Sequence, residues 1–175
     1  MKSPADKKSL KEQASTFLQM HHEAKILGLA NVWDAASAVI IQQAGFPALA
    51  TSSAGIAFSL GYPDGQKITR AEMLAAVQRI VSCENIPVTA DVEAGYGDRP
   101  EDIADTTRGV LEAGAVGLNL EDATGDDANP LVDFVIATGK NPRRKGSCRS
   151  CGRSIGAECA DGYLSAGGWR GGQKI

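Results

Sequence analysis

Three acidic residues have the type and spacing needed for metal-ion chemistry. Asp91 and Glu93 lie in the stretch TADVEAGYGD and Glu121 lies in GLNLED, each at or just beyond the end of an apolar run. Asp91 and Glu93 are two residues apart, so in an extended strand their side chains project to the same side. Carboxylates packed together repel one another, and a divalent cation removes that cost. Oxygen ligands with room for water favour Mg²⁺, with Mn²⁺ as an alternative, over zinc. The competing interpretation is that these are ordinary acids at strand ends or helix caps.

A second group consists of small residues. The stretch Thr51–Gly55 (TSSAG) follows an apolar run and precedes Gly61-Tyr62-Pro63-Asp64. We expect a loop here, in which small side chains would let backbone amides and hydroxyls approach an anionic carboxylate. Asp64 would lie nearby on a turn framed by glycine and proline. An ordinary surface loop is the alternative.

Gly95-Tyr96-Gly97 resembles part of a dinucleotide-binding fingerprint, but the third glycine is missing. We therefore discard a nucleotide-binding interpretation.

The elements that must position these residues alternate along the chain. An amphipathic helix is predicted over residues 9–24. Strands are predicted at 26–33, 48–52, 87–93 and 115–121, and helices at 35–45, 70–83 and 100–113. Trp33 is expected to be a core aromatic and Asp34 a helix N-cap. Strands that alternate with helices of this length predict an α/β fold with parallel strands, either a barrel or a doubly wound sheet.

Composition divides the chain into unlike parts. Residues 1–134 carry 10 Lys and Arg against 19 Asp and Glu, a net charge of −9, whereas residues 135–175 carry 8 against 2, a net charge of +6. An acidic body suits a cation and a small substrate better than nucleic acid. No apolar run approaches the ~20 residues of a membrane helix, so we expect no membrane partner and a cytoplasmic location. We assign 1–24 as a leading helix, 25–134 as the α/β unit and 135–175 as an irregular, disordered tail.

The tail contains nine glycines in 41 residues and three of the four cysteines, Cys148, Cys151 and Cys159. A small zinc or nucleic-acid binding module is the alternative for this part, although a closed zinc site needs four ligands.

The motifs in combination resemble a known family. The strings NVWDAASAVIIQQAGFPALATSSAGIAFSLGYPDG, IPVTADVEAGYGD and LEAGAVGLNLEDA are similar, in order and spacing, to the isocitrate lyase/phosphoenolpyruvate mutase superfamily, and specifically to its phosphoenolpyruvate phosphonomutase-like branch. The resemblance covers about residues 23–133. It implies a TIM-type (β/α) barrel, of which this chain would hold roughly four of eight units, apparently truncated after the fourth strand. It also implies assembly into homo-oligomers.

The same resemblance implies roles for individual residues. Asp91 would be a metal ligand, and Glu93 and Glu121 would hold Mg²⁺ directly or through its waters. Asp64 would be the catalytic acid near the reacting centre. The small carboxylic acid substrate would be bound by Ser52, Ser53 and Ala54. The implied activity is cleavage or formation of a C–C or P–C bond next to a 2-oxo acid, through an enolate-like intermediate stabilised by Mg²⁺.

This sequence departs from the family pattern in three places. Asp91-Val92-Glu93 stands where Asp-x-Asp is common, and its longer second acid reaches further. Residues 122–130 contain neither the Cys of the lyases nor the Lys of the mutases, and no Asn-Ala-Arg-like segment follows Asp133. We therefore expect a Mg²⁺-dependent lyase or mutase acting on some other small 2-oxo or 2-hydroxy acid. A catalytically inactive fragment of such an enzyme is the alternative.

Overall fold

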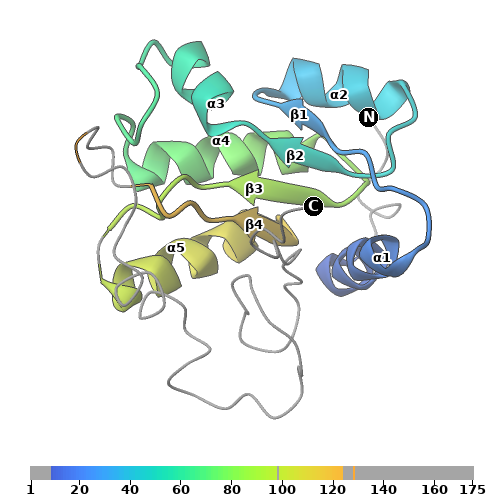
Figure 1. Ribbon diagram of the computed structural model, residues 1–175. Coiled ribbons are helices and arrows are strands. Elements are labelled where there is room, and N and C mark those ends of the chain that lie inside the picture. The colour runs from blue at the N-terminus through green and yellow to red at the C-terminus, as the bar shows by residue number, and fades with distance from the viewer. Residues whose placement is uncertain (1–8, 98, 124–127, 129–175) are drawn as a thin grey trace.

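The computed structural model describes residues 9–97, 99–123 and 128, and a four-stranded parallel sheet forms its centre. The strands are β1 (Ala30–Val32), β2 (Leu49–Thr51), β3 (Val88–Asp91) and β4 (Gly117–Asn119). Their register places Ala30 beside Leu49, Leu49 beside Val88, and Thr89 beside Gly117. Because the strands run the same way, their carboxyl ends meet at one end of the sheet (Figure 1).

The strand order decides between the two α/β arrangements. A doubly wound sheet reverses its order at a switch point, whereas β1, β2, β3 and β4 lie side by side in chain order. Successive right-handed crossovers then place the connecting helices on the same side of the sheet. Helix α2 contacts α4, and α4 contacts α5, as they follow one another around the sheet (Figure 1). The predicted α/β fold is confirmed, and the described residues form part of a (β/α) barrel.

The helices begin where the sequence provides suitable first residues. Ser9, Asp34 and Thr69 each accept a hydrogen bond from a backbone N–H in the first turn of the helix that follows, respectively α1 (Leu10–His22), α2 (Ala35–Gln43) and α4 (Arg70–Ser82). Helix α5 (Pro100–Glu112) begins with a proline, whose missing N–H has no partner to lose at that position. The N-cap role predicted for Asp34 is confirmed.

Two clusters of buried side chains hold these elements together. The larger lies between the sheet and the helices and includes Val32, Leu49, Val88, Met73, Val77 and Ile80. Full burial of side chains of this size stabilises the fold by about 1.5–3 kcal/mol each. The smaller joins Ala14 and Phe17 of α1 to Ala48 and Val116, which directly precede β2 and β4. Helix α1 therefore covers the amino end of the sheet, opposite the carboxyl ends of the strands.

The structure corrects three local predictions. The strands are shorter than predicted, so β3 ends at Asp91 and β4 ends at Asn119. The loop expected at Thr51–Gly55 is wrong, because α3 (Ser53–Ser59) begins within it, buries Ile56 and Ala57, and is capped by Ser52. Trp33 is 44% exposed and is not a core residue. It follows the fully buried Val32, and successive side chains of an extended chain point to opposite sides.

Within the described ranges, no helix is long and apolar enough to cross a membrane. The predictions for residues 135–175, including the zinc alternative, fall outside the described residues.

Candidate active site

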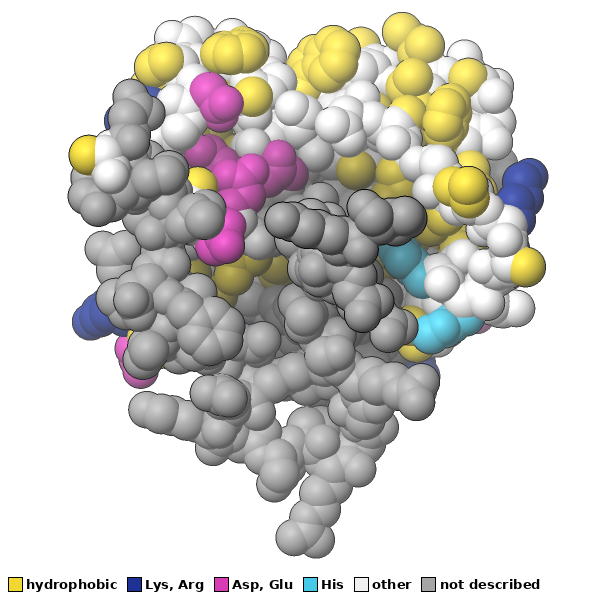
Figure 2. Space-filling view, in the orientation of Figure 1, with side chains coloured by type: hydrophobic (Ala, Val, Ile, Leu, Met, Phe, Trp, Pro, Cys, Tyr) yellow, Lys and Arg dark blue, Asp and Glu magenta, His cyan; other side chains and the backbone are white. Residues whose placement is uncertain are grey.

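The carboxyl ends of the strands carry the residues with predicted chemical roles. Asp91 is the last residue of β3, Ser52 directly follows β2, and Glu121 lies two residues beyond β4. Figure 2 shows most of the visible acidic side chains gathered in one region of the surface, whereas the visible Lys and Arg side chains lie toward the margins of the view. In (β/α) barrels this is the end that carries catalytic residues.

Asp91 is held by hydrogen bonds on both carboxylate oxygens. Its Oδ2 accepts the backbone N–H of Ser53 at 3.0 Å and the Ser53 hydroxyl at 2.7 Å. Its Oδ1 accepts the backbone N–H of Glu93 at 3.2 Å. The backbone N–H of Asp91 donates to Oγ1 of the buried Thr51 at 2.9 Å. The neighbouring strand β2 and the start of α3 therefore fix the orientation of this side chain.

The small residues around the start of α3 have separate contacts. Ser52 is the N-cap, and its hydroxyl oxygen accepts the backbone N–H of Gly55 at 3.1 Å. Ser53 is buried and directs its polar atoms to Asp91. Ala54 lies in the first turn of α3, where backbone amides have no partner within the helix. Of the three predicted substrate-binding residues, Ser53 is thus joined directly to a predicted metal ligand.

Glu93 does not share a strand face with Asp91, and that prediction is wrong. Its backbone φ of 52° takes the chain out of the extended conformation beyond the end of β3. Its Oε2 accepts the backbone N–H of Gln66, and its Oε1 accepts the Tyr96 hydroxyl at 3.4 Å. Burial raises the pKa of Glu93 above its usual value, and the charges of Asp64 and Asp91 raise it further, whereas these two hydrogen bonds lower it.

Glu121 and Asp64 complete the acidic group. The backbone N–H of Glu121 donates to the carbonyl oxygen of Glu93 at 2.7 Å, which holds the chain after β4 beside the turn after β3. Partial burial raises the pKa of Glu121, and so do the charges of Asp91, Asp64 and Asp122. Asp64 is exposed, and one of its carboxylate oxygens accepts the Gly65 N–H at 2.9 Å. The structure therefore brings Asp64 and Asp91 within electrostatic range of both Glu93 and Glu121.

The chemistry of these acids suits Mg²⁺, although they do not form a ready-made ligand cluster. Among the described residues, no three His, Cys, Asp or Glu side chains converge as a group that could hold a metal ion. Mg²⁺ commonly takes only one or two protein carboxylates and keeps several waters. None of the ion pairs found in the described ranges involves the four acids, so their charge is not neutralised by Lys or Arg there. A hydrated cation fits this uncompensated negative charge.

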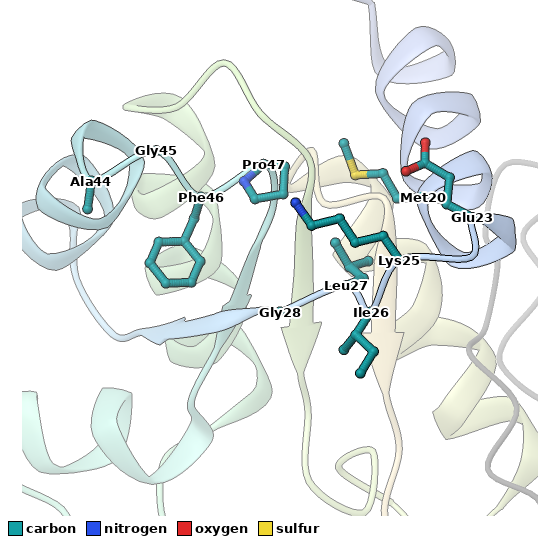
Figure 3. A pocket seen from close by; sticks show the side chains of 10 residues that line it. All are labelled: Met20, Glu23, Lys25, Ile26, Leu27, Gly28, Ala44, Gly45, Phe46 and Pro47. Atoms are coloured by element: carbon teal, nitrogen blue, oxygen red, sulfur yellow. The ribbon is translucent and has the colours of Figure 1, made fainter.

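A pocket lies at the other end of the sheet. Its volume is about 440 Å³, and Figure 3 shows it between the end of α1, the segment before β1 and the turn before β2. Apolar side chains such as Met20, Leu27 and Phe46 line most of it, together with Lys25 and Glu23. None of the predicted site residues contributes to this pocket.

Sequence reasoning missed two residues that contact the acidic group. Gln66 and Tyr96 both bond to Glu93, and the backbone N–H of Tyr96 donates to the Gln66 side-chain oxygen at 2.8 Å. Tyr96 stood within the Gly95-Tyr96-Gly97 motif, which offered a signal for a special backbone conformation. Nothing in the local sequence distinguishes Gln66 from any polar residue in a turn.

Comparisons with known proteins agree with this architecture. The family model described as phosphoenolpyruvate phosphomutase matches residues 17–143. An uncharacterized protein of Mycobacterium tuberculosis H37Rv is 34% identical over 125 residues, which cover 71% of this chain and 46% of that protein. The 2-methylisocitrate lyase of Halalkalibacterium halodurans is 34% identical over 115 residues, 66% of this chain and 38% of the enzyme.

A solved structure shows the same relationship. The structure of a Burkholderia cenocepacia J2315 protein assigned as a phosphonomutase is 42% identical, with a TM-score of 0.70, and the match covers 74% of this chain and 52% of that one. The chain thus spans less than half the length of the curated relatives that it matches. The family model covers well over half of the chain, and the matched region contains all the residues of the candidate site. The chain therefore belongs to the phosphoenolpyruvate phosphomutase family, within the isocitrate lyase/phosphoenolpyruvate mutase superfamily.

Proposed function

We propose that this chain carries the metal-binding part of a Mg²⁺-dependent lyase or mutase that acts on a small 2-oxo or 2-hydroxy carboxylic acid through an enolate-like intermediate. The observation that carries the proposal is the group of four acids at the carboxyl end of the sheet. Burial raises the pKa values of Glu93 and Glu121, and the charges of Asp64 and Asp91 raise both further. A fold keeps such repulsion where a bound cation relieves it. Mn²⁺ has the same ligand preference and could replace Mg²⁺.

Asp91, Glu121 and Glu93 would contribute to binding of the cation in different ways. Asp91 would hold the cation, because Ser53 and the Glu93 backbone fix its carboxylate in one orientation. Glu121 and Glu93 would hold the cation directly or through its water molecules. When bound, the cation supplies a Lewis acid that stabilises negative charge developing on the substrate oxygen.

The substrate contacts follow from the start of α3 and the Asp64 turn. The Ala54 amide and the Ser52 and Ser53 residues would lie against the carboxylate of the substrate, next to the cation. Asp64 would be the catalytic acid that exchanges a proton near the reacting carbon. Relatives named as a 2-methylisocitrate lyase and a phosphonomutase support this choice of reaction classes. Which acid is the substrate is set by residues beyond this group.

Location and assembly are part of the same proposal. Cys83 is the single cysteine before residue 135 and is a free thiol, which is compatible with the reducing cytoplasm. The family resemblance implies homo-oligomers for full-length members of the family.

Isothermal titration with Mg²⁺, with and without pyruvate, tests the proposal. Saturable binding that pyruvate strengthens, and that Asp91→Ala abolishes, is expected. Glu112→Gln is the matched control, because it removes an exposed charge from the far end of α5. A soluble, folded wild-type chain that binds no Mg²⁺ would contradict the proposal and favour the inactive-fragment alternative.

A further inference from the structure

Three residues join the turn that follows α3 to the turn that follows β3. The backbone N–H of Gln66 donates to Oε2 of Glu93, and the Tyr96 hydroxyl donates to Oε1 of Glu93 at 3.4 Å. The backbone N–H of Tyr96 donates to Oε1 of Gln66 at 2.8 Å, which closes the triangle. Gln66 is far from the other two in sequence, so these bonds hold together two turns that would otherwise be independent.

The backbone marks the same three residues. Gln66, Glu93 and Tyr96 have φ values of 56°, 52° and 60°, and they are the only non-glycine residues with positive φ in the described ranges. Non-glycine residues rarely adopt this left-handed backbone conformation, and those that do persist only where surrounding contacts hold them. The hydrogen bonds of the triangle are contacts of that kind. The three residues that share this unusual backbone conformation are also hydrogen-bonded to one another, which indicates that they form one cooperative unit.

The unit lies next to Asp64. Asp64 is two residues before Gln66, in an exposed turn between α3 and the buried Ile68. Near this turn, Arg70 donates to the carbonyl oxygen of Tyr96 at 3.4 Å, which adds a fourth link between the same two segments. The Tyr62 hydroxyl also donates to Glu72 of α4 at 3.4 Å, but the bonds of Gln66 are the ones that join the turn to the segment after β3.

The length of Glu93 is what allows it to bridge. It is 5% exposed, and each of its carboxylate oxygens bonds to a different partner. An aspartate is one methylene shorter and could not keep both partners without movement of the backbone. A glutamine has the same length, can accept the Gln66 N–H through its oxygen, and can donate from its amide to the Tyr96 hydroxyl oxygen.

We propose that Glu93, Gln66 and Tyr96 form a clamp that positions the Asp64 turn over the site, and that the clamp depends on the reach of the Glu93 side chain rather than on its charge. This positioning role of Glu93 is separate from its proposed part in holding the cation. Its importance for turnover rests on the proposed function, whereas the clamp itself does not.

Hydrogen exchange of the full chain at pH 7 without metal tests the clamp. Glu93→Asp is expected to speed exchange of the Gln66 and Tyr96 amides about tenfold, a loss of about 1.4 kcal/mol of protection. Glu93→Gln is expected to leave both amides within about threefold of wild type. Rapid exchange in Glu93→Gln with protection retained in Glu93→Asp would overturn the proposal, as would no change in either variant.

Two further variants keep the test decisive if Glu93→Asp fails to fold. Gln66→Ala removes the acceptor of the Tyr96 N–H and is expected to speed exchange at Tyr96 by about tenfold. Tyr96→Phe removes a single donor to Glu93 and is expected to speed exchange at Gln66 by a smaller factor. Unchanged exchange in both would overturn the clamp.

Mg²⁺ titration of the same variants separates the clamp from the proposed function. With Mg²⁺ saturating, Gln66→Ala and Tyr96→Phe are expected to weaken pyruvate binding, because both variants loosen the Asp64 turn. Their Mg²⁺ affinity is expected to lie within about threefold of wild type, because both variants keep all four acids. Unchanged pyruvate binding in both variants, with Mg²⁺ bound, would overturn the proposal. If wild type binds no Mg²⁺, the proposed function fails, and the exchange experiment still decides the clamp.

Discussion

Ser53 binds Asp91 twice through a single carboxylate oxygen, with its backbone N–H at 3.0 Å and its hydroxyl at 2.7 Å from Oδ2. This pair joins the first residue of α3 to the last residue of β3. Ser53 is buried and Asp91 is half-buried, so the contact is shielded from bulk water. The residue that the family resemblance placed against the substrate thus also sets the orientation of Asp91, the proposed metal ligand.

The first prediction concerns this pair. Ser53→Ala should lower the free energy of unfolding by about 1–2 kcal/mol, because it removes a hydrogen bond to a charged acceptor. Combined with Asp91→Asn in a double-mutant cycle, it should show a coupling energy of about 1 kcal/mol, measured by urea unfolding of the metal-free chain. Ser59→Ala is the control on the same helix, since its hydroxyl bonds only to the Ile56 carbonyl of its own turn. Coupling below about 0.3 kcal/mol would contradict the prediction.

The second prediction concerns Glu121 and pH. Its pKa in the folded chain is raised above the usual value of 4.5, first by burial and then by neighbouring acids. A carboxyl group whose pKa is raised in the folded state stabilises the fold below about pH 4.5. This stabilisation is lost as the pH rises through the pKa of the folded state, because the unfolded state releases the proton more readily. Glu121→Gln should therefore stabilise the metal-free chain at pH 7 and have less effect at pH 4.

Thermal unfolding midpoints at both pH values, with and without Mg²⁺, would measure this effect. The stabilisation by Gln at pH 7 should shrink when Mg²⁺ is present, because the cation relieves the same repulsion. A mutant less stable than wild type in metal-free buffer at pH 7 would refute the assignment of Glu121 to the repulsive group.

The sequence was informative about elements whose signals are local. Asp34 was identified as an N-cap because capping depends on a side chain and the amides next to it. The helix predicted over residues 70–83 is confirmed as α4, Arg70–Ser82, which buries Met73 and Val77. The strand order followed only from the structure, since a barrel and a doubly wound sheet share the same alternation of strands and helices.

The contacts within the candidate site could not be predicted from local sequence patterns. Asp91 and Glu121 could be placed near strand ends from apolar patterns, but their contacts with Ser53 and with the backbone of Glu93 depend on the packing of neighbouring strands. Glu93 was assigned to the wrong local conformation because a period of two was assumed to continue beyond Asp91. Glu93 combines a left-handed backbone with a hydrogen bond from Gln66, which is 27 residues away, and no local pattern carries that information.

The third prediction concerns Gly95, which follows the acidic turn and has a φ of 90°. A Cβ at this position would collide with the Cδ1 atom of Ile103 and would lie 2.8 Å from Cδ1 of Leu120. Ile103 is 1% exposed, so it has little room to move. Gly95→Ala should therefore cost about 1–2 kcal/mol for the left-handed backbone and roughly 1–3 kcal/mol more for overpacking.

Gly45 provides the matched control for this prediction. Its φ of 92° is almost the same, but a Cβ there would meet nothing within 4 Å. Gly45→Ala should cost only the backbone part, about 1–2 kcal/mol. The difference between the unfolding free energies of the two variants, measured with urea, therefore reports how tightly the turn after β3 packs against α5. The conformational cost of the left-handed backbone cancels in this difference. Equal destabilisation would mean that Ile103 and Leu120 yield easily, and that the close approach of α5 does not fix the turn that carries Glu93 and Tyr96.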